Sequence, residues 1–264
     1  MHIISKVFLM ISLMGLIFSD VEKKEQNTYF AGGEELTFKV RYLFFNAAEA
    51  KMTISKTIYQ MQNRPTYKID VTGRTLNIFK IFYVKDNWGT YLDTAKLIPY
   101  ISYRHIEEGD YRKHEQINFD HQKQTATVNI FDRDNRRITE TTSYTVKSGV
   151  QDIVSGFYYL RTLDLSSLSK GQTINIGGFF DKKTYNIKLT YEGKERIKTK
   201  IGEFDTFIFS PTMPSNKLFN GDNPVKVWIT DDKNRIPVKI TANLVVGSLN
   251  MEITEAKGLR HPRP

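Results

Sequence analysis

The alternation of apolar and polar residues near the start of the chain constrains the fold most strongly. In the stretch GEELTFKVRYLFFNAAEAKMTI, every second residue from Leu36 to Phe44 is apolar, and most residues between them are polar. A break of small residues follows, and the alternation resumes at Met52 and Ile54. A period of two predicts β-strands that turn one face toward a core or a ligand and the other toward solvent.

The same pattern recurs over most of the chain, and turn-forming residues separate its segments. Strands are expected at residues 35–45, 48–58, 66–73, 76–84, 88–93, 98–107, 111–119, 125–133, 136–145, 173–178, 184–191, 195–201, 203–209, 225–230, 236–244 and 248–254. Many short strands at this spacing indicate an antiparallel sandwich or barrel. We therefore expect an all-β fold, with a large curved antiparallel sheet or incomplete β-barrel.

One stretch breaks the alternation and predicts a helix from Gly149 to Thr162. Within SGVQDIVSGFYYLRTLDLSSL, the apolar residues recur at helical spacing, at Val150, Ile153, Val154, Phe157 and Leu160. Ser148 and Gln151 have the spacing of a capping box. Because one side of this helix is apolar, we expect it to pack on the concave side of the sheet.

The first residues read as a secretory signal peptide. Lys6 precedes an apolar run over 7–18, which is short for a membrane span of about 20 residues. We expect a signal peptide over 1–19, a flexible lead-in over 20–33, a single β-rich domain over 34–255 and a tail over 256–264. The cleaved protein should be exported to the periplasm or cell envelope and should not span the membrane.

The composition excludes several chemistries. The chain has no cysteine, so disulfides, zinc–thiolate sites and cysteine nucleophiles are excluded. The net charge of +9 admits an anionic partner, but no four basic residues are consecutive, which is typical of a solvated surface. No nucleic-acid-binding motif occurs, and we expect no nucleic-acid partner.

His105 and His114 are the candidate metal ligands. A two-residue hairpin loop at Gly109–Asp110 would place His105 opposite His114 on one face and Arg104 opposite Glu115 on the other. The histidine pair could hold zinc, nickel or copper if a third ligand joined it, or it could simply face solvent.

The common catalytic motifs are missing from the sequence. No nucleophile elbow, acylation motif or phosphate-binding glycine pattern occurs. We therefore expect no cofactor and favour a non-catalytic protein. A metal-dependent hydrolase at the two histidines is the weaker alternative.

Aromatic residues make up 12% of the chain and are candidates for one shared interior. They include Phe44, Phe45, Phe79, Phe82, Tyr83, Phe157, Tyr158, Tyr159, Phe179, Phe180, Phe207, Phe209 and Trp228. Core packing would account for them, and a pocket for an acyl chain or a sugar ring is the alternative. Tyr158, Tyr159 and Arg161 would add polar groups beside such a pocket.

Several stretches resemble the DUF3108 family, which comprises exported bacterial proteins without an established function. They are QDIVSGFYYLRTLDLSSLSKGQTINI, IGEFDTF, VWITDDKNRIPVKITANLVVGSLNMEI and the opening stretch, where Ala47 and Ala48 stand at positions often held by glycine. The family pattern points to Asp152, Tyr159 and Arg161 on the expected helix and to Trp228. Charge on an apolar helix suggests a buried ion pair or a ligand contact.

Two functions remain open. One is an exported binding or carrier module for an amphiphilic, lipid-like or glycan ligand, which the aromatic residues favour. The expected ligand contacts are then Asp152, Tyr158, Tyr159, Arg161 and Trp228. The other is a structural or assembly partner of envelope proteins, which predicts a contiguous exposed apolar patch. The outline also resembles that of periplasmic lipoprotein carriers, a likeness of fold that implies no function.

Overall fold

The computed structural model describes residues 27–76, 83–212 and 223–263. The expected signal peptide over 1–19, the first part of the lead-in, and the interior candidates Phe79 and Phe82 lie outside these ranges. No helix in the described ranges is long and apolar enough to cross a membrane.

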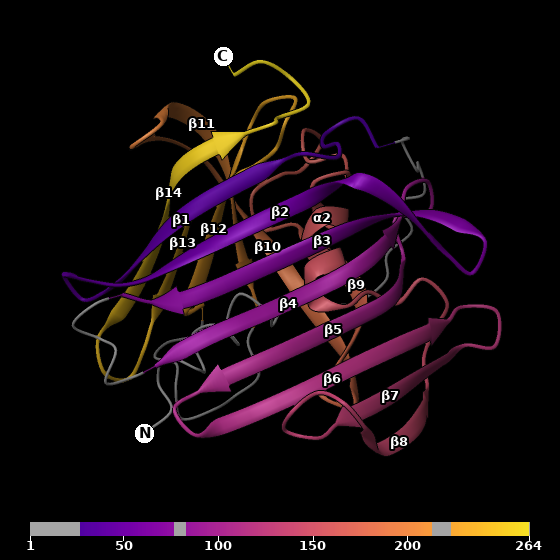
Figure 1. Cartoon of the computed structure of the whole chain (residues 1–264). Helices are drawn as coiled ribbons and strands as arrows, with labels where there is room; N and C mark the ends of the chain where they lie inside the picture. Colours follow the sequence, from indigo (N-terminus) through magenta and orange to yellow (C-terminus); the bar gives the residue numbers. More distant parts are fainter. Residues whose placement is uncertain (1–26, 77–82, 213–222, 264) are drawn as a thin grey trace.

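Fourteen strands of the described residues form one antiparallel sheet (Figure 1). They are β1 (Glu35–Tyr42), β2 (Phe45–Met61), β3 (Arg64–Thr75), β4 (Val84–Asp93), β5 (Pro99–Glu108), β6 (Tyr111–Asp120), β7 (Thr125–Phe131), β8 (Ile138–Thr145), β9 (Thr173–Phe180), β10 (Lys183–Thr199), β11 (Gly202–Pro211), β12 (Val225–Thr230), β13 (Pro237–Asn243) and β14 (Ser248–Lys257). Each strand pairs with its neighbours in sequence, except that β1 joins β14 at the centre and β8 and β9 form the edges. The expected all-β class is confirmed.

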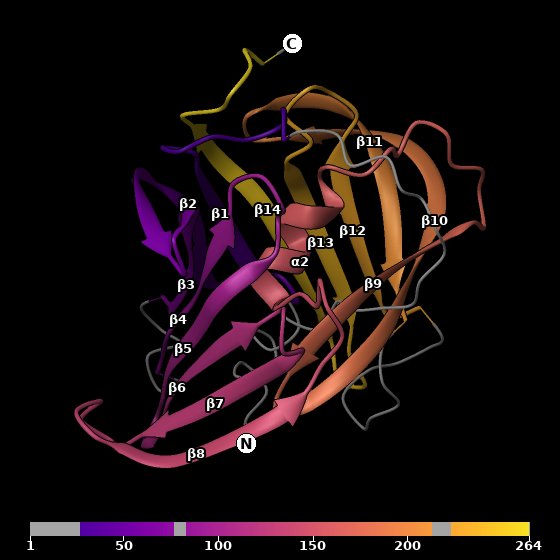
Figure 2. The ribbon, with the colours of Figure 1, turned by 90° about the vertical axis from the view of Figure 1, so that its right-hand side faces the viewer.

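The sheet curves until its two edges approach each other (Figure 2). Phe179 of β9 packs edge-on against Phe119 of β6 and contacts Tyr144 of β8. Gln151 forms a parallel bridge with Gly178 of β9. The result is the incomplete barrel that the strand pattern predicts.

Helix α2 (Ile153–Leu160) lies inside the curve, against β3, β4 and β9. It is shorter than the expected Gly149–Thr162, and the expected cap is wrong. Asp152 is the N-cap, and it forms the capping box with Ser155. The helix cannot begin earlier because the backbone of Gln151 bonds to β9, donating to Gly177 and accepting from Phe179.

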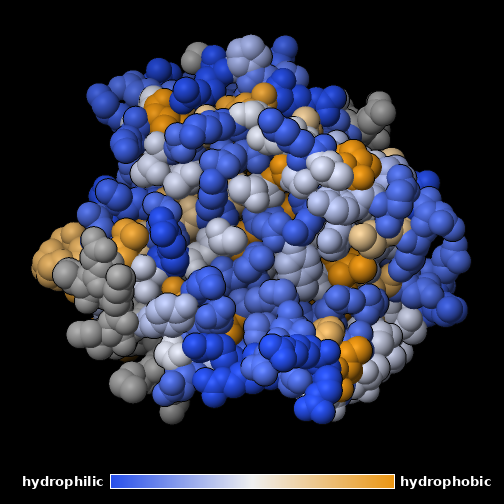
Figure 3. Space-filling model, viewed as in Figure 1, coloured by the Kyte–Doolittle hydropathy of each residue, from blue (hydrophilic) through white to orange (hydrophobic). Residues whose placement is uncertain are grey.

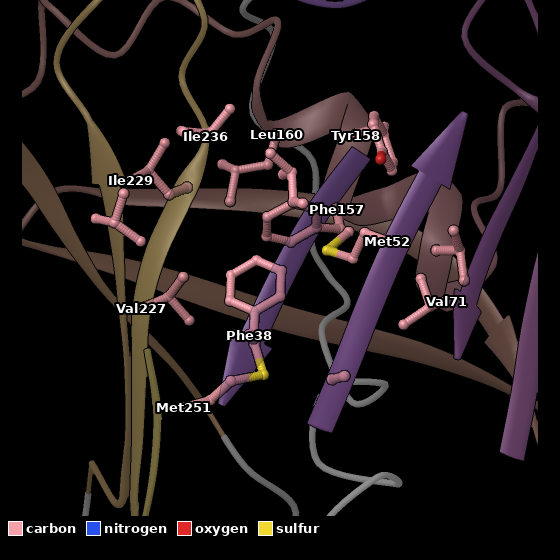
Figure 4. Close-up of a cluster of buried hydrophobic side chains, with 14 of the residues drawn as sticks. Phe38, Met52, Val71, Phe157, Tyr158, Leu160, Val227, Ile229, Ile236 and Met251 are labelled. Carbon is pink, nitrogen blue, oxygen red and sulfur yellow. The ribbon is translucent and has the colours of Figure 1, made fainter. Parts of the chain in front are cut away.

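The apolar face of residues 33–54 packs into the protein core. Figure 4 shows the side chains of α2 between those of the two halves of the sheet. The labelled members are Phe38, Met52, Val71, Phe157, Tyr158, Leu160, Val227, Ile229, Ile236 and Met251. Each fully buried aliphatic or aromatic side chain stabilises the fold by about 1.5–3 kcal/mol.

The first hairpin turns earlier than expected. β1 ends at Tyr42, and Arg41 already pairs with Asn46 of β2. Leu43, with φ +54°, takes the left-handed conformation that the tight turn needs. Phe44 and Phe45, which we counted among the interior aromatics, are therefore 78% and 44% exposed.

The described ends of the chain pack against each other. Phe30 is fully buried. The Arg260 guanidinium donates to the carbonyl oxygens of Asn27 and Phe30 at 3.0 and 3.2 Å. Residues 27–33 and 256–263, where we expected a lead-in and a tail, thus contact the body of the sheet and each other.

Arg161 and Glu34 form a fully buried ion pair that joins these ends to α2. The Nη1 and Nη2 atoms of Arg161 lie 2.6 and 2.7 Å from the two Glu34 carboxylate oxygens, and Nη2 also donates to the Asn234 carbonyl at 2.8 Å. The guanidinium lies 5.1 and 5.0 Å from the ring centroids of Phe30 and Tyr158. Burial alone would lower the pKa of Arg161, but the charge and hydrogen bonds of Glu34, together with the nearby Tyr158 and Asp232, raise it overall.

Glu34→Gln should lower the free energy of unfolding by about 3–5 kcal/mol, because it leaves the buried guanidinium without a counter-charge. Glu35→Gln is the matched control, since its partner Lys51 and Glu35 itself are partly exposed and the pair contributes at most about 1 kcal/mol. Urea unfolding of both variants measures the difference. Equal effects would show that the fold does not depend on the Glu34–Arg161 pair.

Candidate functional site

A pocket lies where the N-terminus of α2 meets the inner face of β4–β6 and the end of β9. It encloses about 310 Å³ of empty space, part of which is open solvent. Trp88, Phe179 and Phe180 supply aromatic lining, and Arg104, Glu115 and Asp152 supply charged groups. The edge closure of the sheet creates this pocket, because β9 brings its two phenylalanines over the inner face of β5 and β6.

A buried ion pair spans the floor of the pocket. Nε and Nη2 of Arg104 donate to the two carboxylate oxygens of Glu115 at 2.6 and 3.0 Å, and Nη2 also donates to Asp181 at 2.8 Å. The hairpin register pairs Arg104 with Glu115, as the expected two-residue loop predicts. Burial would lower the pKa of Arg104, but the two carboxylates raise it overall.

Two aromatic rings lie beside the Arg104 guanidinium. Its central carbon lies 5.4 Å from the Trp88 ring and 4.6 Å from the Phe180 ring, and the two rings stack with centroids 5.7 Å apart. Trp88 is buried, and its indole N–H has no hydrogen-bond partner within the described ranges. Buried donors are usually paired, so this indole N–H is an exception among the described residues.

Asp152 lines the pocket, but its hydrogen bonds belong to the helix. One carboxylate oxygen accepts from the backbone N–H groups of Val154 and Ser155 at 2.8 and 3.1 Å. The other accepts from the Thr90 hydroxyl at 2.6 Å. Burial raises the pKa of Asp152 despite these bonds. Its place in the structure is therefore that of a helix cap that holds one wall of the pocket.

The other expected ligand contacts lie elsewhere. Tyr158 and Arg161 belong to the buried Glu34 cluster, and Tyr159 packs partly buried against the core. Trp228 lies on β12, where its indole N–H donates to Glu195 and the Lys239 ammonium lies 4.6 Å from its ring centroid. Of the five candidates, only Asp152 reaches this pocket.

His105 and His114 face each other as the register predicts, with ring centroids 5.1 Å apart. They lie on the face opposite Arg104 and Glu115, because side chains alternate along a strand. Burial, reinforced by the neighbouring His114, lowers the pKa of His105. Within the described ranges, no group of three or more His, Cys, Asp or Glu side chains could hold a metal ion.

Comparison with known proteins places the chain in a family. The family described as "Protein of unknown function (DUF3108)" matches residues 37–254. The chain belongs to the DUF3108 family. None of the curated proteins matches it.

A solved structure shares the fold of this DUF3108 protein at very low sequence identity. A β-barrel-like protein of the DUF1849 family from Brucella abortus is 7% identical, with 86% of this chain and 98% of that chain covered and a TM-score of 0.54. A presumed exported protein with a YmcC-like fold from Bacteroides fragilis is 9% identical, with 88% and 100% covered and a TM-score of 0.35. The first likeness supports the barrel-like fold, and neither assigns a function.

Sequence reasoning missed most of the residues that meet in the pocket. Trp88, Arg104 and Glu115 stand directly opposite one another on β4, β5 and β6. The Arg104–Glu115 pair could be found from the hairpin, and Trp88 is one of only two tryptophans. Nothing in the local pattern indicated that Phe180, from the far edge of the sheet, would cover them.

Asp86 precedes Trp88 by two residues and shares its inward face of β4. One carboxylate oxygen accepts from the Glu107 backbone N–H at 3.1 Å, and the other is buried without a partner in the described ranges. Burial, together with the charge of Glu108, raises the pKa of Asp86 from 3.8 to about 8. The folded chain therefore keeps this carboxyl protonated where the unfolded chain ionises it.

Folding raises the pKa of Asp86, so the protonated side chain stabilises the fold fully below about pH 4. This stabilisation is lost as the pH rises toward about 8. Asp86→Asn, which keeps a neutral side chain, should gain stability relative to the parent across this window. Urea unfolding at about pH 5 and about pH 8 measures the gain. Asp110→Asn in the exposed β5–β6 turn is the control for losing a carboxylate, and an equal gain there would contradict the assignment to Asp86.

Proposed function

We propose that this DUF3108 protein is an exported, non-catalytic module that binds a single carbohydrate ring in the pocket at Trp88. The observation that carries the proposal is the combination of the stacked Trp88–Phe180 pair with the buried Arg104–Glu115 ion pair. The residues over 1–19, which read as a signal peptide, support export.

A sugar ring matches both kinds of group in the pocket. Its C–H faces pack on aromatic rings, and its hydroxyls exchange hydrogen bonds with carboxylates, guanidinium groups and an indole N–H. The indole N–H of Trp88 supplies a donor that is not already used. A small number of polar groups in an aromatic setting is how ligand sites are usually built.

The charges in and beside the pocket favour a neutral ligand. Arg104 and Lys113 are balanced by Glu115 and Asp181, and the four side chains form one ion-pair cluster. An acyl chain would be disfavoured here, because hydrocarbon offers no hydrogen bonds to a buried ion pair or to an unpaired N–H.

The carboxylates of the pocket support binding rather than catalysis. Glu115 is held in its ion pair with Arg104, and Asp152 is held by two helix N–H groups and Thr90. A glycosidase needs one carboxylic acid and one carboxylate placed across the scissile bond. Here both groups are occupied by the fold itself.

The two tryptophans make the proposal directly testable. In a Trp228→Phe variant, Trp88 is the only tryptophan, so its fluorescence should change when a bound sugar contacts the indole. The probe is a panel of neutral hexose and N-acetylhexosamine oligosaccharides, and calorimetry confirms binding. In the matched Trp88→Phe variant, which keeps a ring but removes the N–H, we expect affinity to fall about 5- to 30-fold, the effect of losing one hydrogen bond to a buried donor.

Equal affinity in the parent and in Trp88→Phe would place the ligand outside this pocket. Binding of none of the neutral sugars, in a protein whose thermal unfolding shows it to be folded, would contradict the carbohydrate assignment. Retained affinity in Trp228→Phe is the internal control, since Trp228 lies outside the pocket.

A further inference from the structure

Exposed apolar side chains gather at one end of the sheet. The tips of two hairpins carry them: Leu43 and Phe44 in the β1–β2 turn, and Val245 and Val246 in the β13–β14 turn. We call these four residues the tip patch. Phe44, Val245 and Val246 are 78%, 60% and 66% exposed, and a hydrophobic area stands out at the left edge of the surface, where the β1–β2 turn lies (Figure 3).

The two tips form one continuous surface because β1 pairs with β14 at the centre of the sheet. The Tyr42 hydroxyl donates to the Val246 carbonyl at 3.0 Å, and the Leu43 backbone N–H donates to the Ser248 carbonyl at 2.9 Å. The tip patch is therefore a protruding surface held by the sheet, and it is not a groove that a helix or strand could fill.

The backbone of the tips is suited to an apolar environment. The N–H of Leu43 is bonded across to Ser248, and the N–H of Leu244 is bonded to the Gly247 carbonyl at 3.0 Å. Backbone groups that lack partners are expensive in lipid, so turns can enter the membrane surface only when such bonds are made within the protein. In the tip patch, apolar side chains extend beyond a backbone in which the Leu43 N–H and the Val246 carbonyl are bonded within the protein.

Residues near the tip patch are of the types that are common among lipid headgroups. Tyr83 and Tyr111 are exposed at the same end of the sheet, and Arg112 lies 6.0 Å from the Tyr83 ring centroid. Arg41, next to the turn, is exposed and forms no ion pair with a residue of the described ranges. Tyrosine and arginine are typical of membrane interfaces, where phosphate groups meet hydrocarbon.

We propose that the tip patch inserts into the surface of a lipid bilayer, so that this end of the barrel faces a membrane of the envelope. The net charge of +9 favours an anionic bilayer as the partner. Four apolar side chains provide weak, reversible binding rather than permanent anchoring. The proposal does not depend on the carbohydrate pocket, whose test is carried out without lipid.

The test is cosedimentation of the exported, purified chain with vesicles of phosphatidylethanolamine and phosphatidylglycerol. The variant Phe44→Ser with Val246→Ser should lose at least about tenfold in partition, because each buried apolar side chain contributes on the order of a tenfold change. The matched control is Ile58→Ser, a side chain that is also exposed but lies toward the opposite end of β2. It should bind like the parent.

A second measurement locates the inserted residue. Phe44→Trp should give fluorescence that brominated lipids quench, and thermal unfolding by circular dichroism shows that every variant is folded. All variants keep the same N-terminus, so residues 1–19 cannot account for a difference between them. Equal partition of the tip variant and the control would overturn the proposal. So would a folded parent that leaves vesicles unbound but self-associates or captures a protein through the tip patch.

Discussion

The buried pairing of Arg161 with Glu34 is the interaction on which the arrangement of the molecule depends. A curved sheet leaves a concave side that must be filled, and α2 fills it. The guanidinium at the end of α2 is held by Glu34 before β1 and by the Asn234 carbonyl between β12 and β13. One side chain thus links the helix to both halves of the sheet. Removing either charge would leave the other buried without a partner, so the pair ties the end of α2 to both halves of the sheet.

A second buried charge pair sits near the opposite end of α2. Arg104 and Glu115 meet under the Trp88 and Phe180 rings, and Asp152 caps the helix beside them. Charges and unpaired donors inside an otherwise apolar interior are expensive, and they commonly mark functional places. The two pairs differ in this respect, because the Arg161 pair is sealed and the Arg104 pair lines a pocket.

The local parts of the fold were predictable from the sequence. The period of two indicated the strands, and the two-residue loop at Gly109–Asp110 gave the register that pairs Arg104 with Glu115 and His105 with His114. The predictions were wrong where contacts with distant parts of the chain opposed the local sequence pattern. The helix begins at Asp152 rather than near Ser148 because Gln151 is bonded to β9. Phe44 is exposed because the chain turns directly after Tyr42, which places Phe44 in the hairpin turn.

The all-β class, the apolar helix and the pairs that face each other across a short hairpin follow from the amino-acid pattern, because they depend on neighbours in the chain. The tertiary structure was needed to show which charge meets Arg161, since its partner Glu34 is 127 residues away. It also decided that Phe180 covers Trp88, and that Phe44 and Val246 share one tip. These contacts depend on the curvature and closure of the whole sheet, which no local pattern of side chains specifies.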